Sequence, residues 1–249
     1  MNEIIRAESL SLTYQAADGE TQALRDVSFS VLPGEFLSII GPSGCGKSTL
    51  LSLVAGLLSP TGGRLFAPPR EKIGYMLQRD GLFDWLTIRK NVLLGLDIRK
   101  QRSADTDAYV DSLLKTYGLW DFKDSFPSQL SGGMRQRAAL IRTLVIRPEV
   151  LLLDEAFSAL DYQTRLAVSD DIEAIIRNEK KTAIMVTHDI SEAISMSDRV
   201  LVLSHRPGTV KSEYTIEFNE GRSSPMQNRE KAEFRSYFNQ VWRDIDVHL

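Results

Sequence analysis

The chain has 249 residues, of which 43% are hydrophobic and 25% charged, with a formal net charge of -3 from 30 Lys and Arg against 33 Asp and Glu. This length is sufficient for one large domain or two modest lobes with a buried core. The slightly acidic balance argues against nucleic acid as a partner, because nucleic-acid binders usually carry a basic excess or stripe. The single cysteine cannot form an internal disulfide, which fits a reducing cytosol.

Neither a signal peptide nor a membrane span is expected. Residues 1–6 lack the apolar core of a signal peptide. No stretch approaches the roughly 18 apolar residues that a spanning helix needs. If the chain works at a membrane, we expect it to do so through a partner that crosses the bilayer.

Apolar patterning predicts strands and helices in alternation along the chain. Strands are expected where apolar residues alternate or run together: 4–14, 27–31, 36–40, 72–77, 150–153, 183–186 and 200–203. Helices are expected over 48–58 and, in large part, from 87 to about 147. The short apolar runs bounded by polar residues are typical of buried parallel strands that alternate with helices.

Apolar residues near the C-terminus fall at helical spacing: Phe234, Phe238, Val241, Trp242 and Ile245. We interpret them as a terminal helix docked on the body of the protein. The alternative is a helix that lies on a membrane surface. The polar face of this stripe carries mixed charge and is not strongly basic, which favours the docked helix.

A glycine-rich loop lies between the strand 36–40 and the helix that follows. It fits the phosphate-loop pattern G-x-x-x-x-G-K-[ST] and comprises Gly41, Pro42, Ser43, Gly44, Cys45, Gly46, Lys47, Ser48 and Thr49. Such a loop directs backbone N–H groups at phosphate oxygens, and the helix N-terminus adds partial positive charge. We expect Lys47 to reach the β- and γ-phosphates of ATP, Ser48 to ligate Mg²⁺, and Thr49 to donate to a phosphate.

Cys45 lies inside this loop and has two interpretations. A thiol near a helix N-terminus can have a depressed pKa and act as a redox switch. The favoured interpretation is that Cys45 is simply small enough to fit.

Two acids follow the apolar run 150–153. Asp154 is in the place of the P-loop acid that holds Mg²⁺ through its water shell. Glu155 is then placed to polarise the attacking water as a catalytic base. Many strands end in acids, but together with the phosphate loop these two predict a site for ATP hydrolysis.

The run Leu130-Ser131-Gly132-Gly133-Met134-Arg135-Gln136-Arg137 resembles the signature motif of the ABC ATPase family, with Met134 where Gln is most frequent. Ser131, Gly132 and Gly133 would open a helix with a hydroxyl cap and an unobstructed backbone, which makes a second anion-binding terminus. In that family the signature motif of one subunit closes over the γ-phosphate held by the other. The resemblance therefore implies a head-to-tail homodimer with two ATP molecules between its subunits.

Further residues resemble landmarks of this family in the expected order. Tyr14 resembles the aromatic residue that stacks on adenine, and Gln78 resembles the glutamine that contacts Mg²⁺, takes part in catalysis and senses the transporter. Residues 158–161, which end in Asp161, resemble the loop that communicates across the dimer. His188 resembles the histidine that hydrogen-bonds the γ-phosphate. His205 and His248 match no motif and are expected at the surface.

The resemblance implies an α/β fold: a P-loop NTPase cassette of ABC type, with a RecA-like core, an antiparallel β subdomain and a helical subdomain. We expect the cassette to span residues 1–216, with the helical subdomain inserted at about 87–147. Residues 217–249 are expected to form a short C-terminal helical extension.

The lack of fused membrane helices, of a second cassette and of sustained heptads favours a separate importer subunit. Residues 76–88 and 204–208 look like the nitrate/sulfonate/taurine branch, which also includes importers of thiamine precursors. The implied partners are transmembrane permease subunits and, indirectly, a solute-binding protein, with the chain peripheral on the cytoplasmic face of the cell membrane. The permease and the binding protein, rather than this subunit, would choose the solute.

Leu82, Phe83 and Trp85 lie where the permease of this branch docks, and we expect them to form part of a permease-binding groove. The alternative is that these side chains belong to the core. A different functional class also remains open: a stand-alone ATPase that regulates a membrane complex without importing a solute. A P-loop kinase of a small molecule would not explain residues 130–137.

Overall fold

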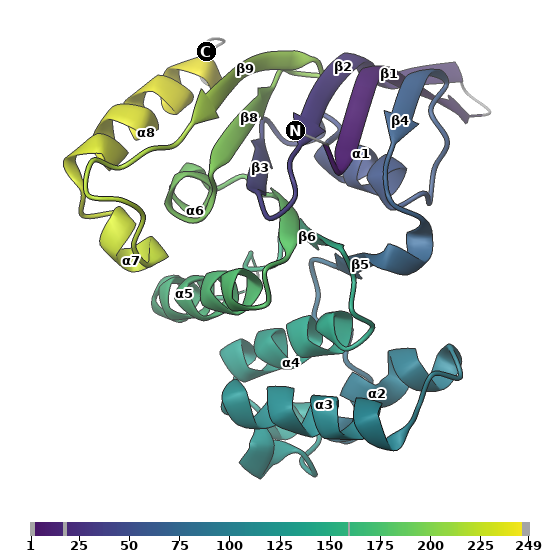
Figure 1. Cartoon of the computed structure of the whole chain (residues 1–249). Helices are drawn as coiled ribbons and strands as arrows, with labels where there is room; N and C mark the ends of the chain where they lie inside the picture. Colours follow the sequence, from purple (N-terminus) through teal and green to yellow (C-terminus); the bar gives the residue numbers. More distant parts are fainter. Residues whose placement is uncertain (1–2, 17–18, 159, 246–249) are drawn as a thin grey trace.

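The computed structural model describes residues 3–16, 19–158 and 160–245. Two sheets and a group of helices make up the molecule, and Figure 1 shows the helices α2, α3 and α4 gathered at the end opposite the antiparallel sheet. The predicted α/β architecture is confirmed. No helix in the described part of the chain is long and apolar enough to cross a membrane.

The smaller sheet is antiparallel and has the order β2-β1-β4. Its strands are β1 (Ile5–Ala16), β2 (Gly19–Val31) and β4 (Gly62–Phe66). The prediction of a strand over 27–31 found only the end of β2, since the polar residues before it lack apolar alternation. β4 was not predicted, because its sequence begins with two glycines and its side chains are largely outside the core.

The larger sheet has the order β5-β6-β7-β3-β8-β9. Five of its strands run parallel: β3 (Phe36–Ile40), β5 (Ile73–Met76), β6 (Val150–Asp154), β7 (Thr182–Val186) and β8 (Arg199–Leu203). Every residue of β3 and β7 is buried, which explains why their sequences are apolar except for Ser38 and Thr182. β9 (Val210–Thr215) is antiparallel to β8 at the edge of this sheet. It was not predicted, because most of its residues are polar.

The helices cover the sheet and extend beyond it. They are α1 (Lys47–Val54), α2 (Ile88–Ile98), α3 (Ala104–Thr116), α4 (Gly132–Leu144), α5 (Tyr162–Asn178), α6 (Ile190–Met196), α7 (Pro225–Asn228) and α8 (Ala232–Ile245), with short 3₁₀ turns at Arg70–Lys72, Trp120–Phe122 and Pro127–Gln129. The prediction of a helix over 48–58 was wrong at its end. α1 stops at Val54 because Gly56 adopts a left-handed conformation with φ of 66°.

The C-terminal helix α8 is docked on the body, as predicted. Val241 is fully buried in a cluster with residues of α6 and β8, and Phe234, Phe238 and Ile245 pack against that cluster. Trp242 differs from the prediction, because half of its surface is exposed and its ring stacks on Phe238 at a centroid distance of 6.0 Å. The apolar stripe is thus largely covered by the protein itself.

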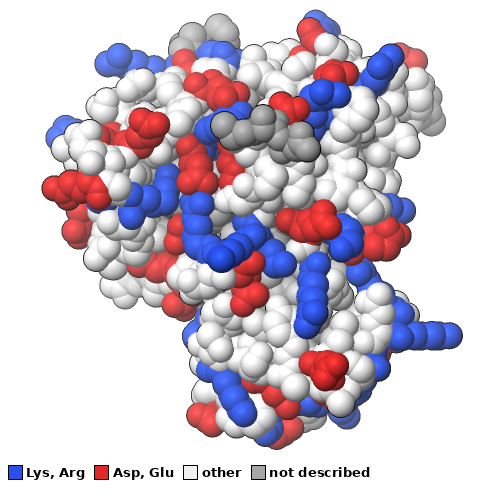
Figure 2. Space-filling model, viewed as in Figure 1, with Lys and Arg blue, Asp and Glu red and all other residues white. Residues whose placement is uncertain are grey.

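Charged side chains of both signs are interspersed over the face of the molecule in Figure 2. Ion pairs at Asp198 join the sheet to its flanking helices. Arg177 on α5 donates to both carboxylate oxygens of Asp198 at 2.9 Å, and the backbone N–H of Phe36 donates to the same carboxylate at 2.8 Å. Arg222 approaches it to 3.5 Å. Asp198 therefore connects β3, α5 and the segment that leads to α7.

We expect Asp198→Asn to lower the free energy of unfolding by about 2 kcal/mol, because the partly buried Arg177 would lose one of its two acidic partners and keep only Glu173. Urea denaturation followed by circular dichroism measures this loss. The exposed Asp121 provides the control, since Asp121→Asn should change stability by less than about 0.5 kcal/mol. Equal effects of the two substitutions would contradict the role given to Asp198.

Candidate functional site

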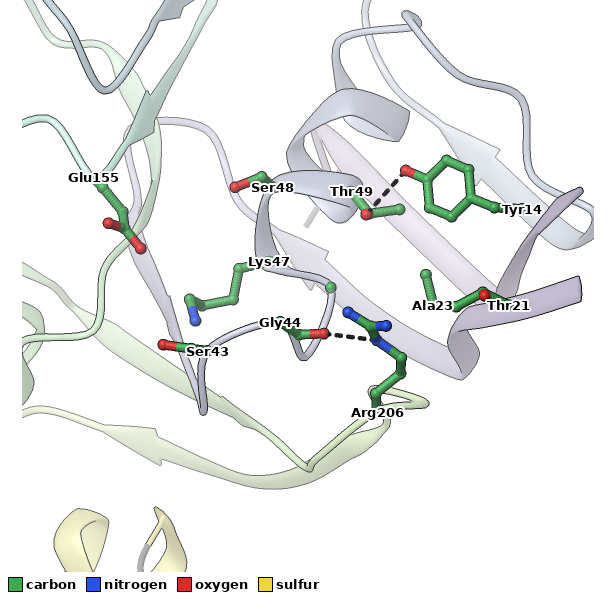
Figure 3. A pocket seen from close by; sticks show the side chains of 11 residues that line it. Tyr14, Thr21, Ala23, Ser43, Gly44, Lys47, Ser48, Thr49, Glu155 and Arg206 are labelled. Atoms are coloured by element: carbon green, nitrogen blue, oxygen red, sulfur yellow. Dashed lines mark hydrogen bonds between the residues drawn. The ribbon is translucent and has the colours of Figure 1, made fainter. Parts of the chain in front are cut away.

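A cavity of about 330 Å³ opens at the carboxyl end of β3, and Figure 3 shows the side chains around it. Most of them come from the phosphate loop, α1 and the hairpin end of β1 and β2. The lining residues are Tyr14, Thr21, Ala23, Ser43, Gly44, Gly46, Lys47, Ser48, Thr49, Glu155 and Arg206. The structure thus brings seven of the predicted nucleotide-binding residues and Glu155 together around one cavity.

Lys47 is held by the phosphate loop itself. Its ammonium group donates to the carbonyl oxygens of Gly41 at 2.8 Å and Pro42 at 3.0 Å, and only 6% of the residue is exposed. The two carbonyls keep the Lys47 ammonium group at the loop. A bound phosphate would compete with them for its N–H donors. The arrangement suits a lysine that exchanges loop carbonyls for phosphate oxygens when a nucleotide binds.

Ser48 and Asp154 meet beside this loop. The Ser48 hydroxyl donates to Asp154 Oδ1 at 3.0 Å, and the hydroxyl of Tyr75 donates to Asp154 Oδ2 at 3.0 Å. Burial and the negative charge of Asp154 raise the pKa of Tyr75, so its hydroxyl remains a donor. Tyr75 was missed by sequence reasoning, because only the pairing of β5 with β6 brings it beside this acid.

These oxygens fit a magnesium ion that also takes phosphate and water ligands. Among the residues that the structure describes, no group of three or more His, Cys, Asp or Glu side chains could hold a metal ion. Mg²⁺ commonly binds through one or two protein oxygens together with substrate phosphates and water, instead of an all-protein cage. The pair of Ser48 and Asp154 matches that donor set.

The Glu155 carboxylate lies close to side chains that follow two neighbouring strands. Its Oε2 accepts from Gln78 Nε2 at 3.3 Å and lies 3.4 Å from His188 Nδ1. Gln78 follows β5, Glu155 follows β6 and His188 follows β7, so the parallel sheet delivers all three to one edge. The backbone of Glu155 has a φ of 46°, an unusual value for a non-glycine residue that often marks a functional position.

Tyr14 lies at the other side of the cavity. Its hydroxyl is 3.1 Å from the Thr49 hydroxyl, and 40% of the residue is exposed (Figure 3). The Tyr14 ring is therefore accessible to a base, while its hydroxyl is anchored at the start of α1. The Thr49 hydroxyl is within hydrogen-bond distance of Tyr14 here, and its donation to a phosphate stays a prediction.

Cys45 is only 1% exposed. Burial raises the pKa of its thiol, and the nearby Lys47 opposes this shift only in part. A buried thiol with a raised pKa is a poor nucleophile. The structure therefore favours the interpretation of Cys45 as a small side chain that fits the loop over a redox switch.

The motif 130–137 begins α4, as its resemblance implied. The Ser131 hydroxyl accepts from the backbone N–H of Met134 at 3.3 Å and caps the helix. A Cβ atom on Gly133 would lie 2.7 Å from Val168 Cγ2, so this glycine also lets α4 pack closely on α5. Neither Ser131 nor Gly132 nor Gly133 lines the phosphate-loop cavity.

Asp161 caps α5, since its carboxylate accepts from the backbone N–H of Thr164 at 3.1 Å, and hydrogen bonds from Thr164 lower the pKa of this carboxyl. Asp161 therefore lies at the N-terminus of α5 and does not line the phosphate-loop cavity. Of the neighbouring positions, Ala159 lies outside the described residues. His205 is exposed, as predicted, and His248 also lies outside the described residues.

Asp80 and Gly81, which follow Gln78, are hydrogen-bonded to arginines of α4. Asp80 pairs with Arg135 at 2.9 Å, and Arg142 donates to the backbone carbonyls of Asp80 and Gly81, each at 2.6 Å. Leu82 is buried in the core, so it cannot be part of a docking surface, contrary to the prediction. Motion of the segment that carries Gln78 is therefore tied to the signature helix.

We expect Tyr75→Phe to raise the Mg²⁺ concentration needed for half-maximal ATP hydrolysis by about fivefold, because Asp154 would lose a donor worth about 1 kcal/mol. Titration of Mg²⁺ at saturating ATP measures this half-maximal concentration. The control is Tyr109→Phe, which removes a hydroxyl that donates to Glu179 at 3.3 Å on another part of the molecule. A response equal to that of the control would show that Tyr75 does not position Asp154.

Comparisons with known proteins agree with this geometry. The family model described as ABC transporter matches residues 24–158. An uncharacterized ABC transporter ATP-binding protein, YtlC of Bacillus subtilis, is 43% identical over 97% of this chain and 95% of its own length. The taurine import ATP-binding protein TauB of Roseobacter denitrificans is 41% identical over 84% of this chain and 81% of its own length.

A solved structure is similar in both fold and sequence. It is the dimeric ATP-binding cassette MJ0796 in a post-hydrolysis state bound to ADP and Pi, with a TM-score of 0.72 and 30% identity. The similarity covers 86% of this chain and 99% of that cassette. The chain therefore belongs to the ABC transporter family, and it is an ATPase of that family.

Proposed function

We propose that this chain is the ATP-hydrolysing subunit of an importer, which binds ATP between two copies of itself and drives solute uptake through a separate membrane permease. The observation that carries the proposal is the separation of two phosphate-binding features. Gly132 and its neighbours begin α4, but none of them lines the cavity at Lys47. A second copy placed head to tail would supply the missing helix terminus over the γ-phosphate.

Relatives support this assembly. MJ0796 forms a dimer, and TauB proteins of the taurine import type lie among the similar sequences. We place this chain in the nitrate/sulfonate/taurine branch, on the cytoplasmic face of the cell membrane, with a solute-binding protein as an indirect partner. We also propose the division into a cassette at 1–216, its helical part at about 87–147, and an extension at 217–249.

The proposed site residues divide the work of hydrolysis among them. Tyr14 would stack on adenine, the backbone of 41–46 and Lys47 would hold the phosphates, and Ser48, Asp154 and Gln78 would hold Mg²⁺. When bound, Mg²⁺ neutralises charge on the β- and γ-phosphate oxygens. Residues 131–133 and Asp161 act across the dimer.

Glu155 acts on the attacking water. The water oxygen forms a bond to the γ-phosphorus while the bond between that phosphorus and the bridging oxygen of ADP breaks, and ADP leaves with the electron pair. Glu155 receives the water proton, and the hydrogen bond from Gln78 orients its carboxylate. The Nε2 atom of His188, on the side of the ring away from Glu155, donates to the γ-phosphate.

A groove beside α2 provides the docking surface for the permease. It has a volume of about 420 Å³ and is lined in part by Phe83, Ile98 and Ile146. Trp85 is 72% exposed and its ring lies 4.9 Å from that of Phe83, which argues against a core role for Trp85. Exposed aromatic residues at the edge of a groove are typical anchors of protein interfaces.

We expect Glu155→Gln to slow ATP hydrolysis by about 100-fold or more and to trap an ATP-bound dimer, because the amide cannot accept the water proton. Size-exclusion chromatography with light scattering would show the mass of two chains only when ATP is present. Glu149→Gln is the matched control, since Glu149 immediately precedes the same strand and does not line the cavity. Its carboxylate lies 3.3 Å from the Lys72 ammonium group. Hydrolysis near the wild-type rate would refute the role of Glu155.

We expect Trp85→Ala to weaken binding of the purified chain to native membrane vesicles, stripped of peripheral proteins, by about tenfold. Sedimentation of the vesicles with increasing protein measures the affinity. Trp242→Ala tests specificity, because Trp242 is similarly exposed at 51% but lies on α8. Retention of full affinity by Trp85→Ala would exclude this docking surface, whereas co-purification with a multi-helix permease separates the importer from the stand-alone regulatory ATPase.

A further inference from the structure

Residues 204–208 form a turn docked against the phosphate loop. Within the turn, the Ser204 hydroxyl accepts from the backbone N–H of Thr209 at 3.0 Å. The backbone N–H of Gly208 donates to the carbonyl of Ala23 at 2.9 Å, which joins the turn to β2. A sequence motif after β8 thus becomes part of the nucleotide site.

Close approach explains the glycine of this turn. A Cβ atom on Gly208 would lie 2.2 Å from the carbonyl oxygen of Cys45, closer than any side chain could come. The turn therefore packs directly on the backbone of the phosphate loop. This contact sets the position of the residue two places earlier, Arg206.

Arg206 reaches over the loop and into the cavity. Its Nε donates to the carbonyl of Gly44 at 3.0 Å, and it lines the same cavity as Lys47 and Tyr14. Figure 3 shows its guanidinium beside Gly44, pointing toward the space in front of Thr49 and Tyr14. The Gly44 carbonyl occupies one N–H of the five that a guanidinium carries.

No acid neutralises this guanidinium in the part of the chain that the structure describes: the ion pairs there do not include Arg206. The side chain is exposed, and its one hydrogen bond to a described residue is the donation to Gly44. A guanidinium without an acid, held at the edge of a phosphate-binding cavity, suits an anionic ligand.

We propose that Arg206 binds the α-phosphate of the nucleotide. The inference rests on the proposed binding of ATP with its base at Tyr14 and its terminal phosphates at Lys47. A nucleotide laid between these two residues places its α-phosphate in the stretch that Arg206 flanks. The 204–208 turn thereby adds the positively charged Arg206 side chain to the nucleotide site. This residue is not part of the phosphate-loop pattern.

The test compares MgATP and MgADP binding to the wild type and to Arg206→Gln by titration calorimetry. Because both nucleotides carry the α-phosphate, the dissociation constant of each should rise about tenfold, by the same factor. Arg206→Lys keeps the charge but loses the planar fork, so its effect should be intermediate. Arg64→Gln, an exposed arginine on β4, is the control and should leave both affinities unchanged.

A spectroscopic measurement separates direct contact from support of the loop. The α-phosphorus NMR resonance of bound MgADP should shift in Arg206→Gln, while the β-phosphorus resonance stays in place. The proposal fails if both affinities are unchanged, if only MgATP binds more weakly, or if both phosphorus resonances move together. Failure of the wild type to bind either nucleotide would instead overturn the proposed function.

Discussion

The parallel pairing of β5, β6 and β7 is the constraint on which the reaction centre depends. Met76 lies opposite Leu153, and Asp154 lies opposite Val186, so the three strands end at one edge of the sheet. A shift of one residue in either pairing would turn the following side chains to the opposite face. This register is what brings the polar atoms of Gln78 and His188 within 3.4 Å of one carboxylate oxygen of Glu155.

Two side chains connect this centre to surfaces where other proteins would bind. Tyr75 donates to Asp154 and also lines the groove beside α2, so one residue touches both the proposed magnesium ligand and the proposed permease site. Asp80 pairs with Arg135 on the signature helix, two residues after Gln78. These contacts connect the groove to Asp154, the proposed magnesium ligand, and connect the segment after Gln78 to the surface proposed for the second copy.

Local sequence patterns were enough to predict the elements whose own residues decide their structure. The buried strands β3, β6, β7 and β8 are short apolar runs, and the helix signals of α4 and α8 match the structure. β4 and β9 were missed because both lie at sheet edges, where half of the side chains face solvent and pairing with a neighbour supplies the stability. The end of α1 was misplaced because Gly56, not a change in hydrophobicity, terminates it.

For this protein the sequence by itself determined the phosphate loop, the acids after β6 and the resemblance to ABC ATPases, because each depends on residue types at fixed local spacing. Only the tertiary structure revealed Tyr75 as a partner of Asp154, the burial of Leu82 and the place of Arg206 at the cavity. Arg206 and Gly44 are 162 positions apart and meet because β8 pairs with β3. Contacts of that kind arise from the packing of whole elements, which no local pattern records.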